Sequence, residues 1–495
     1  MAGRETRRGE GASPSRVRRP YSRFARAWGL WPSRAASTFT AWAERWIPDA
    51  FVFALVATGA VFLAGLVFGH EGPTSLVSAW GKDFWKLVPF TMQMALVIVT
   101  GYVLASSPPV ARAIARLARA PRTARGATVM VAVFSMLTSW INWGFSLIFS
   151  ALLARETARN RPEADYRALA ASSFLGLGSV WAQGLSGSAA LQMATPGMVQ
   201  PKIREIVEGA GAVPGGLIPL TATIFTWQSL LSVAIEIALV GAVVWAYTPG
   251  PDRARTAAQM GVTLEPILAA PEPRAQAATP GERLEHSTAL NLAVFALGAT
   301  YLFATFRSAA DKIAAIDLDA INFGFLMLGV LLHGTPARLM RAVREGTPAT
   351  WGVILQFPFY AGIAGMITHS ALNARMAGAF VRLSSRATFP PLIVAYSALL
   401  GVFVPSGGGK WVIEAPYILR AAEDLHVHLG WTVAVYNLGE ALANLVQPFW
   451  MLPTLAILGL KARDVMGYTF VVFLVLTPVV LGMATWLGGT LGYPL

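Results

Sequence analysis

The stretch VPSGGGKWVIEAP, residues 404–416, is the part of the sequence that most clearly indicates the fold. It places three glycines, a lysine and a glutamate inside an apolar run that extends over residues 388–419. Pro405 removes a backbone donor and the glycines free the backbone, so a plain helix is not expected here. At membrane depth, irregular backbone is tolerated only where protein or a wet cavity surrounds it. The stretch therefore predicts a helix break that is buried within a membrane protein.

The composition of the whole chain supports this class. Hydrophobic residues make up 55% and charged residues 13% of the sequence, against about 25% charged residues in a soluble domain. A membrane-spanning helix needs roughly 20 apolar residues. The chain has no cysteine, which excludes disulfides and thiol chemistry. Apolar runs of suitable length occur at about 50–68, 88–107, 127–153, 166–196, 217–247, 287–306, 321–333, 350–368, 388–419, 431–460 and 465–489.

The net charge of +13 is concentrated near the N-terminus, where residues 1–34 hold nine arginines. We expect residues 1–45 to form a basic cytoplasmic tail that lies near anionic lipid, rather than an arm that binds nucleic acid. No short apolar core with a cleavage site follows promptly, so the tail is not expected to be a secretory signal.

The two halves of the chain, 46–248 and 286–495, resemble each other across a Pro-rich linker at 249–285. VPFTMQMALVIVTGYVLASS begins the first set of features and QFPFYAGIAGMITHSALNAR begins the second. Each is followed by an Arg-bearing stretch, an apolar run that a small polar motif interrupts, a long interrupted span and a last plain helix. This order indicates an internal repeat.

The Lys and Arg residues predict the orientation. With a cytoplasmic N-terminus, the loops at 108–125, 334–346 and 461–464 and the linker are also cytoplasmic, while the arginines of 374–386 fall outside. The two hairpins then enter the membrane from opposite sides. We therefore predict an all-α polytopic membrane protein with two inverted structural repeats, each with a re-entrant helical hairpin and an interrupted transmembrane helix.

The two polar motifs are candidate substrate-binding segments. Backbone N–H groups at the start of a half-helix suit an anion. The glycine run is no phosphate-binding P-loop, because Trp411 stands where Ser or Thr is required. Lys410 is open to three interpretations, as a partner of an anionic substrate, of Glu414 or of backbone carbonyls. The candidates are Asn142, Trp143, Gly144, Ser406, Gly407, Gly408, Gly409, Lys410 and Trp411, and the two tryptophans either line the site or only pack.

A coupling-ion site is predicted in WTVAVYNLGEALANLVQPFW, residues 431–450. Its polar residues are spaced by 3, 4 and 3 and share one helix face. Glu440 is the first choice for binding a proton or Na⁺, because an ionisable group inside a membrane helix is a functional candidate. The alternative is a carboxyl that is hydrogen-bonded for packing. The candidates on this face are Asn437, Glu440, Asn444 and Gln447.

The corresponding span of the first half, 171–197, carries Ser172, Ser179 and Gln183 on roughly one face. Residues 184–188 are predicted to unwind, which adds Ser186, Gly187 and Ser188 to the candidate substrate site. Small residues also serve close helix packing, so this signal is weaker. The six histidines have no metal-ligand spacing, and no catalytic constellation supports an enzyme. We expect no cofactor other than a coupling H⁺ or Na⁺.

Several motifs together resemble a known family, the bacterial short-chain fatty acid transporters of the AtoE type. The resemblance runs from about Trp46 to the C-terminus. It is carried by RWIPDAFVFAL at 45–55, FTMQMALVIVTGYVLASS at 90–107, INWGFSLI at 141–148, SGSAALQMATPG at 186–197, QFPFYAGI at 356–363, VPSGGGKWVI at 404–413 and NLVQPFWMLPTLAI at 444–457.

The resemblance implies uptake of short-chain carboxylates such as acetoacetate or butyrate across the inner membrane. We expect a secondary transporter in a lipid bilayer that holds a monocarboxylate between the two hairpin tips, by proton or sodium symport. Trp143, Trp411 or Phe449 is expected to supply a small apolar wall for the alkyl tail. A transporter of another organic anion such as a dicarboxylate, a passive channel and a membrane enzyme remain alternatives. A homo-oligomer is possible.

Overall fold

The structure is a computed structural model that describes residues 50–195, 199, 201–209, 213–266, 279–309, 312, 315, 318–403 and 407–495. Within these residues the secondary structure is helical and contains no strand. The predicted basic tail at 1–45 and the candidate residue Ser406 lie outside the described residues.

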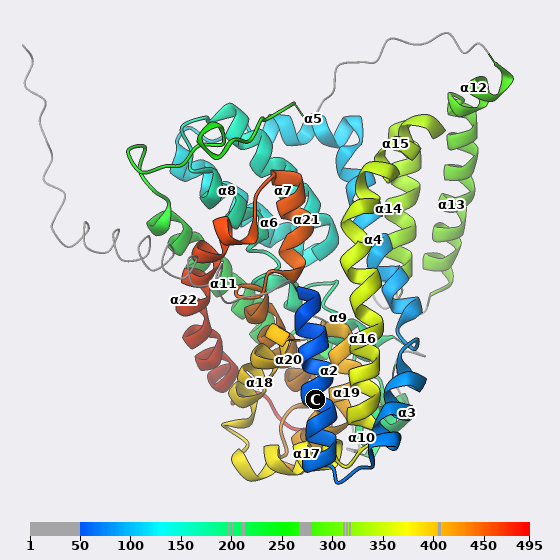
Figure 1. Cartoon of the computed structure of the whole chain (residues 1–495), viewed down its shortest axis with the longest axis vertical. Coiled ribbons are helices and arrows are strands. Elements are labelled where there is room, and N and C mark those ends of the chain that lie inside the picture. Colours follow the sequence, from blue (N-terminus) through cyan, green and yellow to red (C-terminus); the bar gives the residue numbers. More distant parts are fainter. Residues whose placement is uncertain are drawn as a thin grey trace, which may run out of the picture.

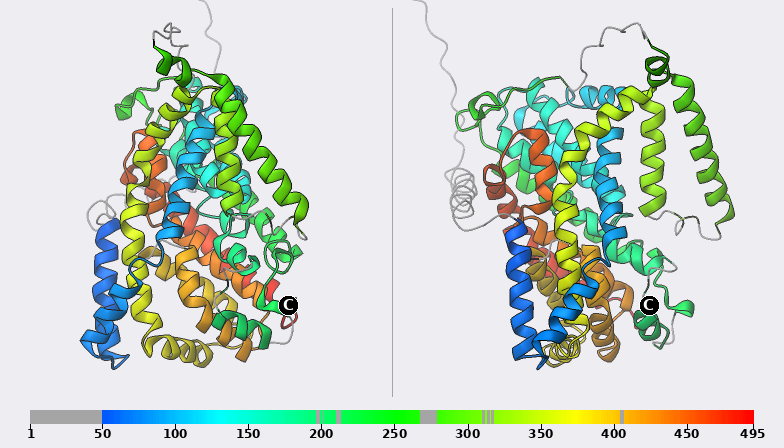
Figure 2. Two further views of the ribbon diagram at one scale, coloured as in Figure 1. Left: turned by 90° about the vertical axis from the view of Figure 1, so that its right-hand side faces the viewer. Right: turned by 45° about the vertical axis from the view of Figure 1, so that its right-hand side comes forward.

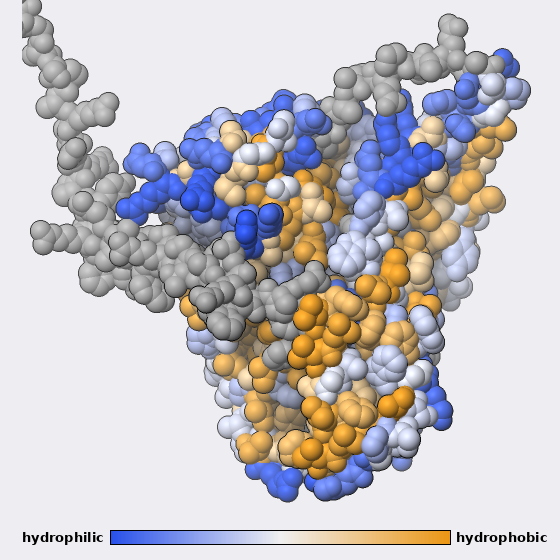
Figure 3. Space-filling view, in the orientation of Figure 1, coloured by the Kyte–Doolittle hydropathy of each residue, from blue (hydrophilic) through white to orange (hydrophobic). Residues whose placement is uncertain are grey.

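Five of the described helices are long and apolar enough to cross a membrane, and up to seven spans result if two bent helix pairs are counted. Figure 3 shows apolar residues along the flanks and hydrophilic residues at the two ends. The protein is thus a multi-pass membrane protein, as predicted. The five helices are α6 (Ala124–Ile141), α11 (Trp227–Tyr247), α13 (Thr288–Ser308), α16 (Trp351–Thr368) and α22 (Ala462–Gly488).

The helices of the first half follow one order along the chain. With the three short 3-10 turns η1, η2 and η3 they are α2 (Ala50–Val67), α3 (Pro73–Asp83), α4 (Val88–Ser106), α5 (Pro108–Leu117), α6, α7 (Trp143–Asn160), α8 (Tyr166–Phe174), η1 (Val180–Gln183), α9 (Ser188–Ala194), α10 (Pro201–Gly209), η2 (Pro214–Gly216), η3 (Leu220–Ala222) and α11.

The second half repeats this order after η4 (Ala258–Met260), α12 (Pro280–Glu285) and α13. Figure 2 shows α14 beside α4 and α13 beyond α14, at the edge of the molecule. The repeated elements are α14 (Leu318–His333), α15 (Pro336–Gly346), η5 (Thr347–Thr350), α16, α17 (Leu372–Leu383), α18 (Phe389–Phe403), α19 (Gly407–Asp424), α20 (Leu429–Asn444), η6 (Phe449–Met451), α21 (Leu452–Leu458) and α22.

The two halves are inverted. Figure 1 shows α5, which follows α4, at the top of the molecule, and its counterpart α17, which follows α16, at the bottom. The Arg-bearing stretch at 374–386 therefore lies at the opposite end from the one at 108–125, as the inverted repeat predicts, although the Lys and Arg distribution alone would place both stretches on the cytoplasmic side. Each half also contains a hairpin, α6–α7 and α18–α19, and an interrupted helix.

The interrupted helix of the second half breaks where the sequence predicts, whereas that of the first half breaks about ten residues before the predicted stretch 184–188, where Gly176 packs directly against the Ser135 carbonyl. In the first half α8 ends at Phe174 and only the short η1 and α9 follow, while in the second half α20 is bent by 68° from the helical segment Phe449–Leu458. Every residue of α20 is buried, which places this helix in the core. Irregular backbone here is therefore covered by protein, as membrane depth requires.

One predicted span differs from the structure. The run 217–247 is helical as α11 only from Trp227, because Pro219 lacks a backbone donor and the chain forms the short turn η3 before it. Thr226 then caps α11 by accepting a hydrogen bond from the N–H of Ser229, 3.2 Å away.

Candidate functional site

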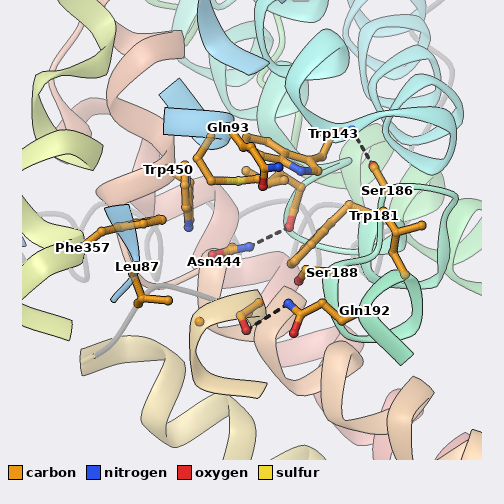
Figure 4. Close-up of a pocket in the computed structure, with 16 residues that line it drawn as sticks. Leu87, Gln93, Trp143, Trp181, Ser186, Ser188, Gln192, Phe357, Asn444 and Trp450 are labelled. Carbon is orange, nitrogen blue, oxygen red and sulfur yellow. Dashed lines mark hydrogen bonds between the residues drawn. The ribbon is translucent and has the colours of Figure 1, made fainter. Parts of the chain in front are cut away.

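A cavity of about 190 Å³ lies where the tips of the two hairpins meet the two interrupted helices. Figure 4 shows its lining side chains converging from both halves of the chain. Seven sequence-predicted site residues line it, namely Trp143, Ser186, Ser188, Gly407, Gly408, Gly409 and Asn444.

Four aromatic rings form the apolar walls of the cavity. Trp143, Trp181, Phe357 and Trp450 all line it. The ring centroids of Trp143 and Trp450 are 5.2 Å apart in an edge-to-face arrangement, and those of Phe357 and Trp450 are 6.3 Å apart. Such contacts hold the rings in fixed orientations. The cavity therefore has a stiff, mainly apolar shape.

Polar groups meet at one side of the cavity. Ser188 Oγ and Trp181 Nε1 are buried and make no hydrogen bond. Beside them α19 begins at Gly407, and a Cβ atom added to Gly407 would lie 3.1 Å from Ser188 Oγ and from the Trp181 ring. The Ser188 hydroxyl and the first turn of the 18-residue helix α19 thus meet beside the benzene edge (Cη2) of the Trp181 ring. A hydroxyl and the start of a helix both favour an anion.

The two glutamines that line the cavity are already engaged. Gln192 Nε2 donates to the Gly408 carbonyl at 3.0 Å, which ties α9 to the start of α19. Gln93 Nε2 donates to Asp319 Oδ1 at 2.7 Å, which ties α4 to α14. These bonds fix the positions of the surrounding elements.

The tip of the first hairpin uses its own donors. Asn142 Oδ1 accepts from the N–H of Phe145 at 2.8 Å, and the N–H of Trp143 donates to Ser186 Oγ at 2.9 Å. Gly144 packs on α4, since an added Cβ would lie 1.8 Å from Val97 Cγ1. The ring of Trp143 reaches the cavity, whereas the structure places Asn142 and Gly144 behind its wall.

Gly187 and Trp411 also lie outside the lining. Gly187 forms a tight turn in which an added Cβ would meet the Ala182 carbonyl oxygen at 2.6 Å. Trp411 is buried, and its ring packs on that of Tyr436 with centroids 4.8 Å apart. Of the two alternatives for the tryptophans, Trp143 lines the cavity and Trp411 packs. Phe449 stands behind Trp450, with ring centroids 4.9 Å apart.

Lys410 is paired with Glu440. Its Nζ lies 2.5 Å from Glu440 Oε2 and donates to the Ser397 carbonyl at 3.1 Å, and both side chains are at most 2% exposed. Glu414, the partner considered from the sequence, instead accepts from the Tyr436 hydroxyl at 2.8 Å. Lys410 therefore neutralises an intramembrane carboxylate and does not line the cavity.

Glu440 lies directly behind the cavity wall. A Cβ atom on Gly407 would come within 3.1 Å of Glu440 Cγ. Glu440 Oε1 and the side-chain oxygens of Asn437 and Asn444 are buried and accept no hydrogen bond. This face of α20 is thus rich in free acceptors, which suits a proton or a small cation.

The amide nitrogens on the same face hold the first half of the chain. Asn437 Nδ2 donates to the Ala182 carbonyl at 3.3 Å and Asn444 Nδ2 to the Leu177 carbonyl at 3.1 Å, so α20 lies against the broken first-half helix. Gln447 Oε1 accepts from the N–H of Phe449 at 3.2 Å and supports the break in the second half. The four predicted coupling residues therefore gather at the contact between the two interrupted helices.

Sequence reasoning missed several residues of this region. Gln93, Trp181 and Gln192 line the cavity but were not among the candidate residues, although Trp181 and Gln192 lie within the interrupted span 171–197. Glu236 is a fully buried carboxyl in α11. A lone ionisable residue in an apolar span was the available signal for Glu236. For Trp181 no sequence signal distinguishes a cavity wall from ordinary packing.

The chain is similar to proteins of one family. The family model described as short chain fatty acid transporter matches residues 32–487. A protein of Escherichia coli (strain K12) is 38% identical over 440 residues, which cover 88% of this chain and 95% of the relative. A protein of Haemophilus influenzae (strain ATCC 51907 / DSM 11121 / KW20 / Rd) is 34% identical over 455 residues, which cover 90% of this chain and 98% of the relative. Both are described as candidate short-chain fatty acid transporters.

Two solved structures are more distantly similar. The YdaH transporter of Alcanivorax borkumensis aligns with a TM-score of 0.49 at 15% identity and covers 90% of this chain and 99% of its own. Neisseria gonorrhoeae MtrF aligns with a TM-score of 0.49 at 14% identity, and the alignment covers 90% of this chain and 97% of the MtrF chain.

Proposed function

The chain belongs to the short-chain fatty acid transporter family, and from this premise we propose that it is a secondary active transporter that takes up short-chain monocarboxylates. Butyrate and acetoacetate are the proposed substrates, and the bacterial inner membrane is the proposed location. The observation that carries the proposal is the aromatic cavity of about 190 Å³ between the two inverted halves. It is smaller than the roughly 300–1,000 Å³ of pockets for drug-sized ligands, so it suits a small solute.

The substrate carboxylate is proposed to lie against the start of α19. Ser188 Oγ is a buried donor without a partner, and the N-terminal turn of α19 adds its dipole. Leaving such a donor unpaired is unfavourable, so a bound carboxylate would satisfy it. The alkyl tail then contacts the rings of Trp143, Phe357 and Trp450.

A monocarboxylate fits better than a dicarboxylate. No charged side chain is found among the described residues that line the cavity. A second carboxylate would be buried against aromatic rings without a partner, which costs several kcal/mol. A transporter of another small organic monoacid remains the second candidate.

Coupling is proposed to act through Glu440. A proton or Na⁺ on this carboxylate would weaken its attraction to Lys410, whose helix α19 carries the cavity glycines. The free oxygens of Asn437 and Asn444 offer further ligands for a cation, and Gln447 supports the break beside them. Binding of the ion would thereby alter the position of the α19 tip.

The membrane orientation is part of the proposal. The ends of α5 and α15 carry Arg112, Arg116, Arg338 and Arg341, and we assign this end, with the linker 249–285, to the cytoplasm. The basic tail at 1–45 would then lie along anionic lipid on the same side.

Uptake of labelled butyrate or acetoacetate into proteoliposomes tests the function. Saturable uptake that responds to an imposed proton or sodium gradient is expected, with weak competition by dicarboxylates. The absence of saturable uptake under both gradients would refute the proposal. Conductance without gradient-driven accumulation would indicate a channel instead.

The coupling role is tested by Glu440→Gln. This variant should lose gradient-driven accumulation but keep part of the butyrate exchange across the membrane. Glu205→Gln, at an exposed position on α10, is the control and should behave as the wild type. Unchanged accumulation in Glu440→Gln would remove this residue from the mechanism.

A further inference from the structure

The middle of α11 holds a further buried carboxyl, that of Glu236. Its side chain is 0% exposed within one of the most apolar helices of the chain. The coupling mechanism proposed above makes no use of it. Ionisable residues in this setting are rare, because their charged form is costly in an apolar surrounding.

The hydrogen bonds of Glu236 are unevenly distributed. Oε1 accepts from Gln183 Nε2 at 2.6 Å and from Ser232 Oγ at 3.0 Å. Glu236 Oε2 and Gln183 Oε1 are both buried and have no partner. Two oxygens of this small cluster therefore lack a donor.

The elements packed chiefly against α11 are α6, η1 and α22. Gln228 bonds to Thr490 and the Tyr247 ring packs on Tyr468, so α11 and α22 are antiparallel and an apolar part of α22 faces Glu236. η1 holds no titratable residue. The titratable groups of the three helices lie near their cytoplasmic ends, at Arg125, Tyr247, Arg463, Asp464 and Tyr468.

Those groups are remote from the carboxyl. Tyr247 is 11 residues beyond Glu236 in the same helix, which is about 16 Å at 1.5 Å per residue. Beyond η1, the nearest carboxylate–lysine pair is Glu440 with Lys410, and these two groups neutralise each other. No cation in the described part of the chain pairs with Glu236.

We propose that Glu236 is a proton-binding site that holds its proton at neutral pH and is joined to the cavity through η1. An ionised, unpaired carboxylate in an apolar interior costs several kcal/mol, and such a group neutralises instead. A proton on Glu236 also adds one donor to a cluster in which two oxygens lack one. The ligand of this site is the proton itself.

The connection to the cavity is short. Gln183 ends η1, and Trp181 of the same turn lines the cavity. Between them the Ala182 carbonyl is held by Asn437 of α20. A displacement of the Trp181 ring therefore changes the surroundings of Glu236 through one 3-10 turn.

Infrared spectroscopy of the full chain in lipid nanodiscs at neutral pH tests the site without any substrate. The C=O stretch of a protonated carboxyl is expected in the wild type and its loss in Glu236→Gln. Glu236→Asp should keep the band at a shifted frequency, which guards against loss through misfolding. An unchanged band in Glu236→Gln, or a wild-type band that appears only after Na⁺ is removed, would overturn the proposal.

Two glutamates provide controls. Glu156 is equally buried but accepts two hydrogen bonds of 3.1 Å from Arg159 Nε, and Glu205 is exposed. Their Gln variants should leave the carboxyl band in place. The link through η1 is tested by Trp181→Ala, which should shift the Glu236 band, whereas Trp143→Ala, whose ring packs on Trp450 and lies outside η1, should not. An unshifted band in Trp181→Ala would overturn the link.

Discussion

The two halves of the molecule bury a carboxyl beside their interrupted helices in different ways. In the second half Glu440 lies 2.5 Å from the ammonium of Lys410. In the first half Glu236 meets only the neutral donors of Gln183 and Ser232. The halves thus share an order of helices but not a charge pattern.

This difference shows that one fold can bury a carboxyl group in two ways, with a cationic partner or with neutral hydrogen-bond donors. An ion pair needs both partners, because either one alone would be an uncompensated buried charge. A carboxyl with neutral partners needs a proton instead. The two proposals made above thus assign one site that exchanges an ion against a lysine and another that stores a proton.

The largest effect should come from breaking the pair in the second half. Lys410→Met leaves Glu440 buried without its cation, and we expect a loss of about 3–5 kcal/mol in the free energy of unfolding. The double variant Lys410→Met/Glu440→Gln should recover most of it. Denaturant unfolding in detergent measures both, and an equal loss in the double variant would contradict the pairing.

Denaturant unfolding of Glu236→Gln gives the corresponding value for the buried carboxyl of the first half. Glu236→Gln replaces a neutral acid by a neutral amide of similar shape, so its loss should remain below about 1 kcal/mol. A loss as large as that of Lys410→Met would mean that Glu236 is ionised and paired.

The next largest effect comes from alanine substitutions at the two hairpin tips, which should act on different properties. Gly144→Ala places a methyl group 1.8 Å from Val97 Cγ1, and such overpacking costs about 1–3 kcal/mol of stability. Gly407→Ala meets its neighbours at 3.1 Å and should mainly weaken uptake. Thermal unfolding and butyrate uptake separate the two, and the reverse assignment would contradict the cavity at the second tip.

A smaller change is expected in chain-length preference. Trp450→Ala removes a ring from the cavity wall and leaves room for a longer alkyl chain. Each additional CH₂ group that is buried there contributes about 0.8 kcal/mol, or about fourfold in affinity. Hexanoate should therefore compete better against butyrate uptake in this variant. Trp245→Ala, at a half-exposed position on α11, is the control. An unchanged ratio of hexanoate to butyrate competition would place the alkyl tail elsewhere.

The smallest effect concerns the caps of the interrupted helices. Asp165 caps α8, and His428 caps α20 by accepting from the N–H of Trp431 at 3.0 Å. Burial lowers the pKa of His428 to about 4, so the folded state favours the neutral ring.

The stabilisation from His428 is complete above its unfolded pKa of about 6.5 and is lost as the pH falls toward 4. Most of this loss reflects the cost of charging a buried ring, and the part that comes from the cap hydrogen bond itself is about 1 kcal/mol. Unfolding curves between pH 7 and pH 4 should show this loss in the wild type and less of it in His428→Asn. An identical pH dependence in the variant would exclude the cap.

Much of the fold could be predicted from the sequence. Apolar length, the glycine run before Lys410 and the proline after Gln447 placed the spans and their breaks. The polar spacing in 431–450 also placed Glu440 and Asn444 on one face. These are local properties, since they depend on hydrogen-bonding capacity and helix periodicity.

The contacts of the site could not be predicted in the same way. Lys410 and Glu440 are 30 residues apart, and either of two glutamates suited the lysine. Trp181 faces the cavity and Trp411 does not, although both follow a helix break. Which face of a tryptophan or which carboxylate meets a cavity depends on the packing of distant helices.

Local patterns in the sequence are enough to identify a helical membrane protein with two related halves and buried breaks, because the bilayer forbids exposed irregular backbone. The packing of distant helices is needed to show that Gly407, Gly408 and Gly409 border an aromatic cavity without charged lining residues. The same packing shows that Lys410 pairs with Glu440. Pairing in a low-dielectric interior is set by ångström distances between elements, and no local pattern encodes those distances.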